Sequence, residues 1–394
     1  MTDSATHPAS TPVIELHSFH ALRPGPRVLV LGGVHGNETA GPVAIRQILA
    51  EFADGRRQLQ RGTLSFVPVA NPVAWAAGRR EGDRNLNRDF RPSLSPENAE
   101  DRIASRLGPI LASHDVLVDL HTFSAPGVPF VFFGPVNNQD ELEPFAHAAD
   151  EERLARAIGP QRLVYGWLSA YAKGVRRRQN GSIAYGIGTT EYMRAHGGYA
   201  VTVECGQHLD PEAPAVARAA IDNTLRLLGL GGLADEDEKD VRTAHAAETG
   251  TPAGEGTSHG RSDCHDGRIS QGNGCDAGTS NGNGTRNDND TGNDNDTGTG
   301  TDTRTGSPTC SGKELIELYD VFDRHDLQDR FAREWRSFDR VAAGEPIAFR
   351  ADGQAIRAPE DGYVVFPNPG TPPGREWFYF ARPGQRQLSR GNSH

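Results

Sequence analysis

The stretch from Val28 to Gly41 reads VLVLGGVHGNETAG, and it decides the fold of the chain. Its first four residues form an unbroken apolar run that ends in two glycines, which is typical of a strand buried on both faces. The segment after Glu38 has the spacing of a helix and continues to Ala50. A buried strand, a glycine turn and a helix in this order indicate an α/β domain.

The same alternation of apolar runs and helical patterns continues outward from this stretch to about residue 230. The runs predict strands at Leu64–Val69, Val116–Leu120, Pro129–Phe133 and Ala200–Val203, and helices at Glu97–Ala112, Asp140–Ile158 and Glu212–Leu228. Continuous apolar strands between helices indicate a largely parallel sheet that helices cover on both faces. We therefore expect an α/β domain over residues 1–234.

Residues 235–312 have a different composition, with Val241 and Ile269 as their only members of the set V, I, L, M, F, W and Y. Such a segment buries too little apolar surface to offset about 1–2 kcal/mol of backbone entropy per residue, so we expect a disordered linker or insertion. Its 15 acidic and 6 basic side chains carry −9 of the formal charge of −11. The remainder of the chain is therefore near neutral.

The sequence changes again after this tract. Short β-type runs (PIAF, YVVF, EWFYF) are interrupted by glycine and proline, and they predict a small all-β module over residues 313–394. Glu314–Asp320, at the start of this region, fits either a strand or a short helix.

Composition excludes several classes of protein. No apolar run approaches the about 20 residues of a membrane span, and the first residues lack the basic start and apolar core of a signal peptide, so we expect no membrane association. The near-neutral charge outside the tract argues against nucleic acid as a partner. Three of the four cysteines lie in the tract, and Cys205 ends an apolar strand. No disulfide framework is expected, and a reducing cytoplasm fits.

Potential metal ligands follow two of the predicted strands. His35 and Glu38 leave the first strand three residues apart, and His121 ends the strand that starts at Val116. Ligands in open α/β sheets bind at the carboxyl ends of strands, so we expect these side chains to meet. Two histidines and one carboxylate form a three-ligand set with an open fourth position, as in catalytic zinc sites.

Four motifs in order resemble the succinylglutamate desuccinylase/aspartoacylase family, whose members are zinc-dependent amidohydrolases related to the zinc carboxypeptidases. The motifs are GGVHGNETAG (32–41), NPVAWAAGRREGDRNLNRDF (71–90), VDLHTF (118–123) and VTVECGQ (201–207). The resemblance covers roughly residues 26–230 and, more faintly, the C-terminal module. It implies a zinc-carboxypeptidase-like, largely parallel or mixed sheet covered by helices, and one zinc ion per chain held by His35, Glu38 and His121.

The resemblance also assigns roles to residues around this metal site. Glu204 matches the family's catalytic glutamate, and Arg80 matches the arginine that polarises the scissile carbonyl. Asn87 and Arg88 match a pair that grips a substrate carboxylate, and Arg194 matches a second carboxylate-binding arginine. Glu204 also lies between an apolar run and glycine, so partial desolvation should bring its pKa toward the working pH.

Two positions depart from the family pattern. The family usually has aspartate where this chain has Asn85, a change expected to alter how the neighbouring arginines are oriented. In aspartoacylase a tyrosine of the C-terminal domain reaches the substrate, whereas the comparable stretch here, Asn368–Gly374, contains no aromatic residue.

We therefore expect a zinc amidohydrolase that deacylates a small N-acyl amino acid through zinc-activated water, with Glu204 as the general base. The two carboxylate-binding arginines, Arg88 and Arg194, imply a substrate with two carboxylates. The alternatives are a zinc carboxypeptidase-type peptidase and a metal-binding scaffold without turnover, although a scaffold needs neither Glu204 nor Arg80. Whether the chain forms a homo-oligomer is left open.

Overall fold

The computed structural model describes residues 13–178, 181–231 and 312–388. The prediction of a disordered tract over residues 235–312 therefore falls almost entirely outside the described residues. Within them, no helix is long and apolar enough to cross a membrane.

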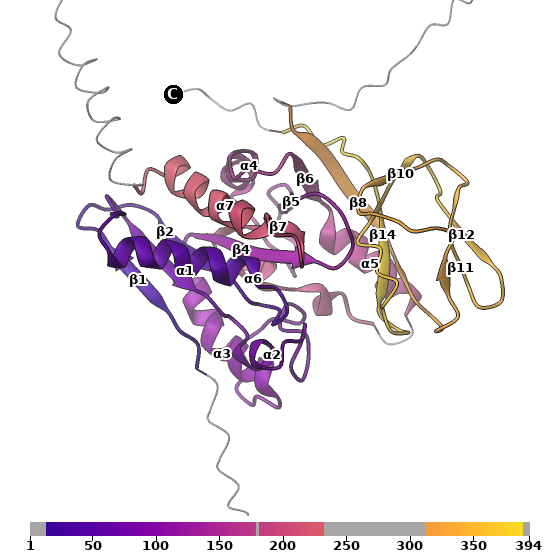
Figure 1. Ribbon diagram of the computed structural model, residues 1–394, viewed down its shortest axis with the longest axis horizontal. Coiled ribbons are helices and arrows are strands. Elements are labelled where there is room, and N and C mark those ends of the chain that lie inside the picture. Colours follow the sequence, from indigo (N-terminus) through magenta and orange to yellow (C-terminus); the bar gives the residue numbers. More distant parts are fainter. Residues whose placement is uncertain (1–12, 179–180, 232–311, 389–394) are drawn as a thin grey trace, which may run out of the picture. The chain divides into compact units, whose positions relative to one another are not determined.

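The described residues form helices, one short 3-10 helix and strands, most of them labelled in Figure 1. The helices are α1 (Ala40–Ala53), α2 (Pro72–Ala76), α3 (Ala99–Ala112), α4 (Ala148–Ala157), α5 (Trp167–Arg177), η1 (Ile183–Gly186), α6 (Thr189–Ala195) and α7 (Ala213–Leu227). The strands are β1 (His17–His20), β2 (Arg27–Leu31), β3 (Thr63–Val67), β4 (Val116–Phe123), β5 (Phe130–Phe132), β6 (Arg162–Tyr165), β7 (Tyr199–Gln207), β8 (Glu314–Asp323), β9 (Arg330–Phe331), β10 (Asp339–Val341), β11 (Pro346–Phe349), β12 (Ala355–Arg357), β13 (Gly362–Val365) and β14 (Glu376–Pro383).

Most strands belong to one mixed sheet with the order β1-β3-β2-β4-β7-β5-β6-β8-β14-β13-β10. The central pairs β3–β2, β2–β4 and β4–β7 are parallel, as are β5–β6 and β6–β8. β5 runs antiparallel to β7, and the pairs after β8 are antiparallel. The predicted α/β class is confirmed, and of the two expected sheet types, largely parallel or mixed, the sheet is mixed.

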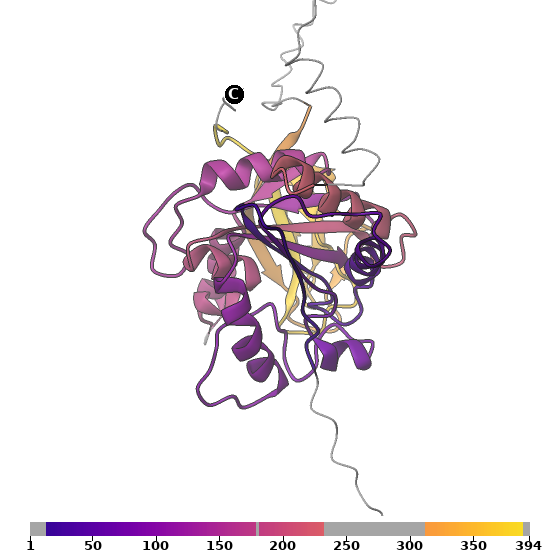
Figure 2. The same ribbon diagram turned by 90° about the vertical axis from the view of Figure 1, so that its left-hand side faces the viewer.

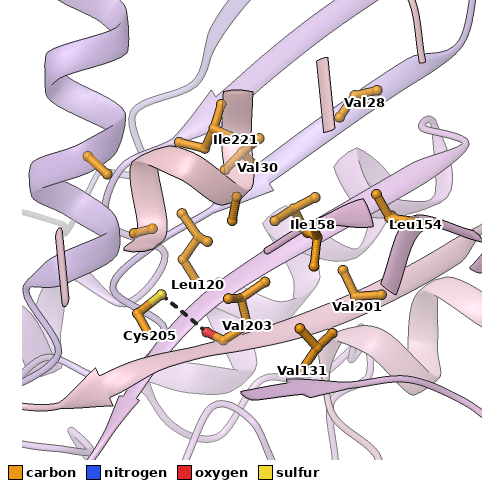
Figure 3. Close-up of a cluster of buried hydrophobic side chains, with 14 of the residues drawn as sticks. Val28, Val30, Leu120, Val131, Leu154, Ile158, Val201, Val203, Cys205 and Ile221 are labelled. Carbon is orange, nitrogen blue, oxygen red and sulfur yellow. Dashed lines mark hydrogen bonds between the residues drawn. The ribbon is translucent and has the colours of Figure 1, made fainter. Parts of the chain in front are cut away.

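Helices cover both faces of this sheet, as Figure 2 shows. Alternate residues of β2 belong to different cores: Val28 and Val30 pack with α1, α4 and α7, whereas Leu29 and Leu31 pack with α3 and α6. Figure 3 shows the first of these cores. Burial on both faces explains why the central strands read as continuous apolar runs.

The C-terminal residues extend the sheet. β8 pairs with β6 on one side and with β14 on the other, so the segment that fitted either a strand or a helix is a strand. β6 would otherwise leave an edge of unpaired backbone groups, which β8 satisfies. The β-rich character predicted after residue 313 is confirmed, and β9, β11 and β12 form a separate small sheet.

Some elements differ from the sequence prediction. The helix expected over Asp140–Ile158 begins only at Ala148. Pro144 lacks a backbone donor and disfavours helical geometry in the residue before it, which accounts for the later start. β1, β6, α5 and α6 were not predicted; β6 has only two fully buried residues, so its apolar signal is short.

The continuity of the sheet gives a stability prediction. Ile316 of β8 is fully buried in a core shared with Phe130 and Val164. Ile316→Ala should lower the free energy of unfolding by about 2–5 kcal/mol, because it removes buried methyl groups and leaves a cavity. Urea unfolding measures this loss. Leu209→Ala, at a residue 87% exposed, is the control and should change stability by no more than about 0.5 kcal/mol. Equal effects of the two substitutions would contradict the placement of β8.

Candidate active site

The loop between β2 and α1 supplies two of the predicted metal ligands. His35 and Glu38 both lie in it, and their side chains are 3% and 2% exposed. Gly36 brings this loop against α2, where an added Cβ would lie 2.0 Å from the carbonyl carbon of Ala74. Only glycine allows this approach, which fixes the loop between the two ligands.

Neighbouring strands supply two more of the predicted site residues. His121 of β4 and Glu204 of β7 are partners in the strand register. Val118 and Leu120 of β4, with Val203 of β7, point into the core under α1 and α7. Because side chains alternate along a strand, His121 and Glu204 share the opposite face.

The three predicted ligands converge. His35 Nδ1 lies 2.8 Å from Glu38 Oε1, and His121 Nδ1 lies 3.0 Å from Glu38 Oε2. One potential ligand atom from each of the three residues lies within 4.8 Å of the other two. All three side chains are buried. Two imidazole nitrogens and a carboxylate around one point fit a divalent metal such as zinc.

The outer nitrogen of each histidine also faces an oxygen. His35 Nε2 is hydrogen-bonded to Asn85 Oδ1 at 3.0 Å, and His121 Nε2 lies 3.1 Å from Asp119 Oδ2. Such outer contacts orient metal-binding imidazoles. The residue at position 85, which departs from the family pattern, therefore contacts the predicted ligand His35. The sequence analysis expected an effect on the neighbouring arginines; the contact seen for the Asn85 side chain is with His35.

Glu38 and Glu204 are buried carboxylates in different electrostatic environments. Burial raises the pKa of Glu38, but His35 and His121 outweigh this and hold it well below its usual range. Burial raises the pKa of Glu204 to about 8, against the opposing charges of His121 and Arg80. The Oε2 atom of Glu204 is buried without a hydrogen-bond partner among the described residues. Glu204 is thus available to a molecule that enters the site.

The three site residues predicted in the second motif, Arg80, Asn87 and Arg88, line the same cavity as the candidate metal ligands. Arg80 Nη1 donates to Glu38 Oε1 at 3.2 Å, whereas the adjacent Arg79 makes no such contact, which supports the assignment of Arg80. Asn87 Oδ1 accepts a hydrogen bond from the Thr189 backbone at the start of α6. Arg88 is buried, and its guanidinium carbon lies 4.7 Å from the Trp167 ring centroid.

Arg194 also lines the cavity, but internal acceptors engage all of its nitrogens. Nε lies 2.9 Å from Glu151, Nη1 lies 2.7 Å from Glu143, and Nη2 donates to the Ala200 carbonyl at 2.8 Å. Burial raises the pKa of Glu143 to about 7, against the charge of Arg194. The structure therefore does not present Arg194 as a free carboxylate-binding group.

The C-terminal region contributes cavity residues that the sequence analysis missed. Phe366, Glu376 and Tyr379 line the same cavity as His35 and Glu204. Glu376 Oε2 accepts a hydrogen bond from Arg88 Nη2 at 3.3 Å. The alternation of a strand predicts that Tyr379 of the EWFYF run faces the opposite side from Phe378 and Phe380, and the structure places Tyr379 in a different core from these two residues. The run does not show which of its faces meets the site.

Comparison with known proteins identifies the family. The family model of the succinylglutamate desuccinylase/aspartoacylase catalytic domain, which describes the sequences of its members, matches residues 24–228, more than half of the chain. The chain belongs to this family.

Among curated relatives, the human N-acyl-aromatic-L-amino acid amidohydrolase (carboxylate-forming) is 38% identical over 112 residues, which cover 25% of this chain and 34% of that protein. A probable aspartoacylase of Parasynechococcus marenigrum is 35% identical over 117 residues, covering 27% and 37%. The matches thus span about a third of the length of these relatives. The crystal structure of a succinylglutamate desuccinylase/aspartoacylase from Rhodobacter sphaeroides is 17% identical, with a TM-score of 0.58 over 94% of this chain and 90% of that one. This similarity shows a shared fold.

The converging ligands give a metal-binding prediction. His121→Ala removes one of three ligands and should lower the bound zinc of the purified protein well below one ion per chain, measured by atomic absorption. His114→Gln is the control, because His114 is buried but bonded to Ser65 and to the Ile110 carbonyl, away from the cluster. Full zinc occupancy in His121→Ala would exclude the assigned ligand set.

Proposed function

We propose that this protein is a zinc-dependent amidohydrolase that cleaves the amide of an N-acyl amino acid. One observation carries the proposal: the strand register sets the unpartnered carboxylate of Glu204 beside His121, within the cavity where His35, Glu38 and His121 converge. A structural metal site needs no free carboxylate in its cavity. The human relative is an amidohydrolase of N-acyl amino acids, which supports the same reaction type here.

His35, Glu38 and His121 would hold one zinc ion per chain. When bound, zinc supplies a Lewis acid that lowers the pKa of water toward about 7 and polarises an amide carbonyl. Arg80 adds a positive charge at the same place. It lies beside Glu38, is about half exposed, and can donate to a carbonyl oxygen that gains negative charge during the reaction.

Glu204 moves the proton in the proposed reaction. As a base it removes a proton from the attacking water, and as an acid it returns the proton to the leaving nitrogen. Burial favours the first step, because a carboxylate whose pKa is raised toward 8 takes up the proton of water more readily than an exposed one would.

This role predicts the effect of an isosteric substitution. Glu204→Gln keeps the shape and polarity of the side chain but removes the base, so kcat should fall by roughly 10²–10⁴. Zinc content and the circular dichroism spectrum should stay as in the wild type. Glu212→Gln is the control, because Glu212 is an exposed glutamate a few residues after Glu204. This variant should keep full kcat. A Glu204→Gln protein with unchanged kcat would exclude this residue as the base.

Arg88 is proposed to bind the carboxylate of the amino acid. Its Nη2 contacts Glu376 at 3.3 Å, a longer distance than those from Arg194 to Glu143 and Glu151, and its Nε has no partner among the described residues. Glu376 has a second partner, Arg178, at 3.4 Å. Arg88 therefore retains donors for a substrate carboxylate, and Asn87 lies beside it in the cavity.

The Arg88 assignment is tested with a pair of substrates. Arg88→Ala should raise KM at least about tenfold for an N-acetyl amino acid, because it removes a charge-assisted clamp, and should change KM little for the corresponding amino acid amide. Arg91→Ala, at a guanidinium 75% exposed, serves as the matched control. Equal losses on acid and amide would mean that Arg88 does not bind the carboxylate.

The arrangement of the cavity favours an amidase over a carboxypeptidase-type peptidase. Side chains from the C-terminal region, including Phe366 and Tyr379, line the same cavity as the catalytic candidates. A wall on this side restricts the space for a polypeptide that extends from the scissile bond. We therefore propose a small-molecule substrate. A hydrolysis screen of the zinc-loaded protein against N-acetyl, N-succinyl and short peptide substrates separates the two reactions.

A further inference from the structure

Most arginines that line the cavity are already paired with carboxylates of the protein, which disfavours binding of a second substrate carboxylate. Five of the six arginines that line the cavity have a carboxylate within 3.5 Å. Besides the pairs described above, Arg375 lies beside Glu81 and Arg386 beside Glu152. Arg194, which the family resemblance assigns to a second carboxylate, is the most completely engaged. A second substrate carboxylate held by Arg194 would have to displace its buried pairs with Glu143 and Glu151, which is unfavourable.

A different part of the cavity wall is aromatic. Phe132 of β5, Trp167 at the start of α5, Phe366 after β13 and Tyr379 of β14 all line the cavity. Their centroids are 6.1 Å apart for Phe132–Trp167, 5.4 Å for Trp167–Tyr379, 6.2 Å for Tyr379–Phe366 and 6.0 Å for Phe366–Phe132. The four side chains thus form a closed circuit of ring contacts, called the ring wall below.

The ring wall adjoins the proposed carboxylate anchor. The guanidinium carbon of Arg88 lies 4.7 Å from the Trp167 ring centroid. In an amino acid, the carboxylate and the side chain are attached to the same carbon. A substrate whose carboxylate is held by Arg88 therefore has its amino-acid side chain, rather than only its acyl group, within reach of these rings.

Two features of the ring wall are unfavourable in the protein alone. Phe366 has a φ of +53°, in the left-handed region that a bulky side chain rarely adopts. The Tyr379 hydroxyl is buried without a hydrogen-bond partner among the described residues. Strain of this kind persists where the surrounding structure imposes it and is concentrated at ligand sites. The cavity, of about 830 Å³, has the size of a small-molecule site.

From these observations we infer that the ring wall binds the side chain of the substrate, and that this side chain is aromatic or bulky and apolar. The inference rests on the proposed function for the position of the carboxylate. It replaces the expected dicarboxylate with a monocarboxylate N-acyl amino acid. Burial of the side chain against four rings supplies the binding energy that a second ion pair would otherwise give.

The test measures binding to the full-length, zinc-loaded Glu204→Gln protein, which is not expected to consume its ligand. Isothermal titration calorimetry compares N-acetyl-L-phenylalanine, N-acetyl-L-alanine and N-acetyl-L-aspartate. The phenylalanine ligand should bind more tightly than the other two by about tenfold or more, as expected for burial of a benzyl group. Equal or tighter binding of the aspartate ligand, or no binding preference, would overturn the inference.

Substitutions in the ring wall locate the preference. Phe132→Ala should remove about tenfold or more of the affinity for the phenylalanine ligand and leave the alanine ligand unchanged. Phe132→Leu, which keeps most of the apolar volume, should lose less. Phe331→Ala is the control, because Phe331 is half-buried against Trp377 in the small sheet and does not line the cavity. Equal losses for all three ligands in Phe132→Ala would overturn the inference.

Turnover by the wild-type protein distinguishes this inference from the proposed function. If the phenylalanine ligand binds with the expected preference but no N-acyl amino acid is hydrolysed, the proposed function is wrong and the role of the ring wall in binding the side chain is supported. If N-acetyl-L-aspartate is hydrolysed with a higher kcat/KM than N-acetyl-L-phenylalanine, the proposed function stands and the ring wall fails as the specificity site.

Discussion

The burial of β2, β4 and β7 on both faces is the constraint on which the site depends. Two-sided burial leaves no solvent for polar side chains, so each polar residue on these strands must find a partner or serve a ligand. Asp119 and His121 of β4 meet each other, and His121 meets Glu38. Glu204 Oε2, like Asp119 Oδ1, is buried without a hydrogen-bond partner among the described residues, but Glu204 also forms no ion pair with them. A sheet covered on one face only would leave this carboxylate hydrated and would weaken its basicity.

Charge pairing shapes the rest of the cavity. Buried guanidinium groups require carboxylates, because an unpaired charge is very unfavourable in a desolvated site. Arg194 satisfies this need internally through Glu143 and Glu151, and Arg88 does so only in part through Glu376. The two arginines that look equivalent in the sequence therefore differ in what they can offer a substrate. This difference supports the proposal that the substrate side chain is held by apolar contact and not by a second charge.

The C-terminal region contributes to the site because it is part of the same sheet. β8 continues the sheet beyond β6, and β14 follows it, which carries Glu376 and Tyr379 to the cavity wall. In sequence these residues lie more than 150 positions from Glu204. Pairing between strands thus links the stability of the fold to the composition of the active site.

The sequence by itself determined the α/β class, the central strands β2, β3, β4 and β7 with the helices α1, α3 and α7, and the candidate ligands His35, Glu38 and His121. These follow from local pattern, because strand ends and short turns place residues that are close in sequence or at one sheet edge. Only the tertiary structure decided that Arg194 is engaged by Glu143 and Glu151, that Asn85 faces His35, and that Tyr379 reaches the cavity from outside the stretch where an aromatic residue was expected. Each of these depends on contacts between segments that are distant in the chain. Packing decides which carboxylate pairs with a buried arginine and which face of a strand meets the cavity, so the local sequence pattern cannot predict either.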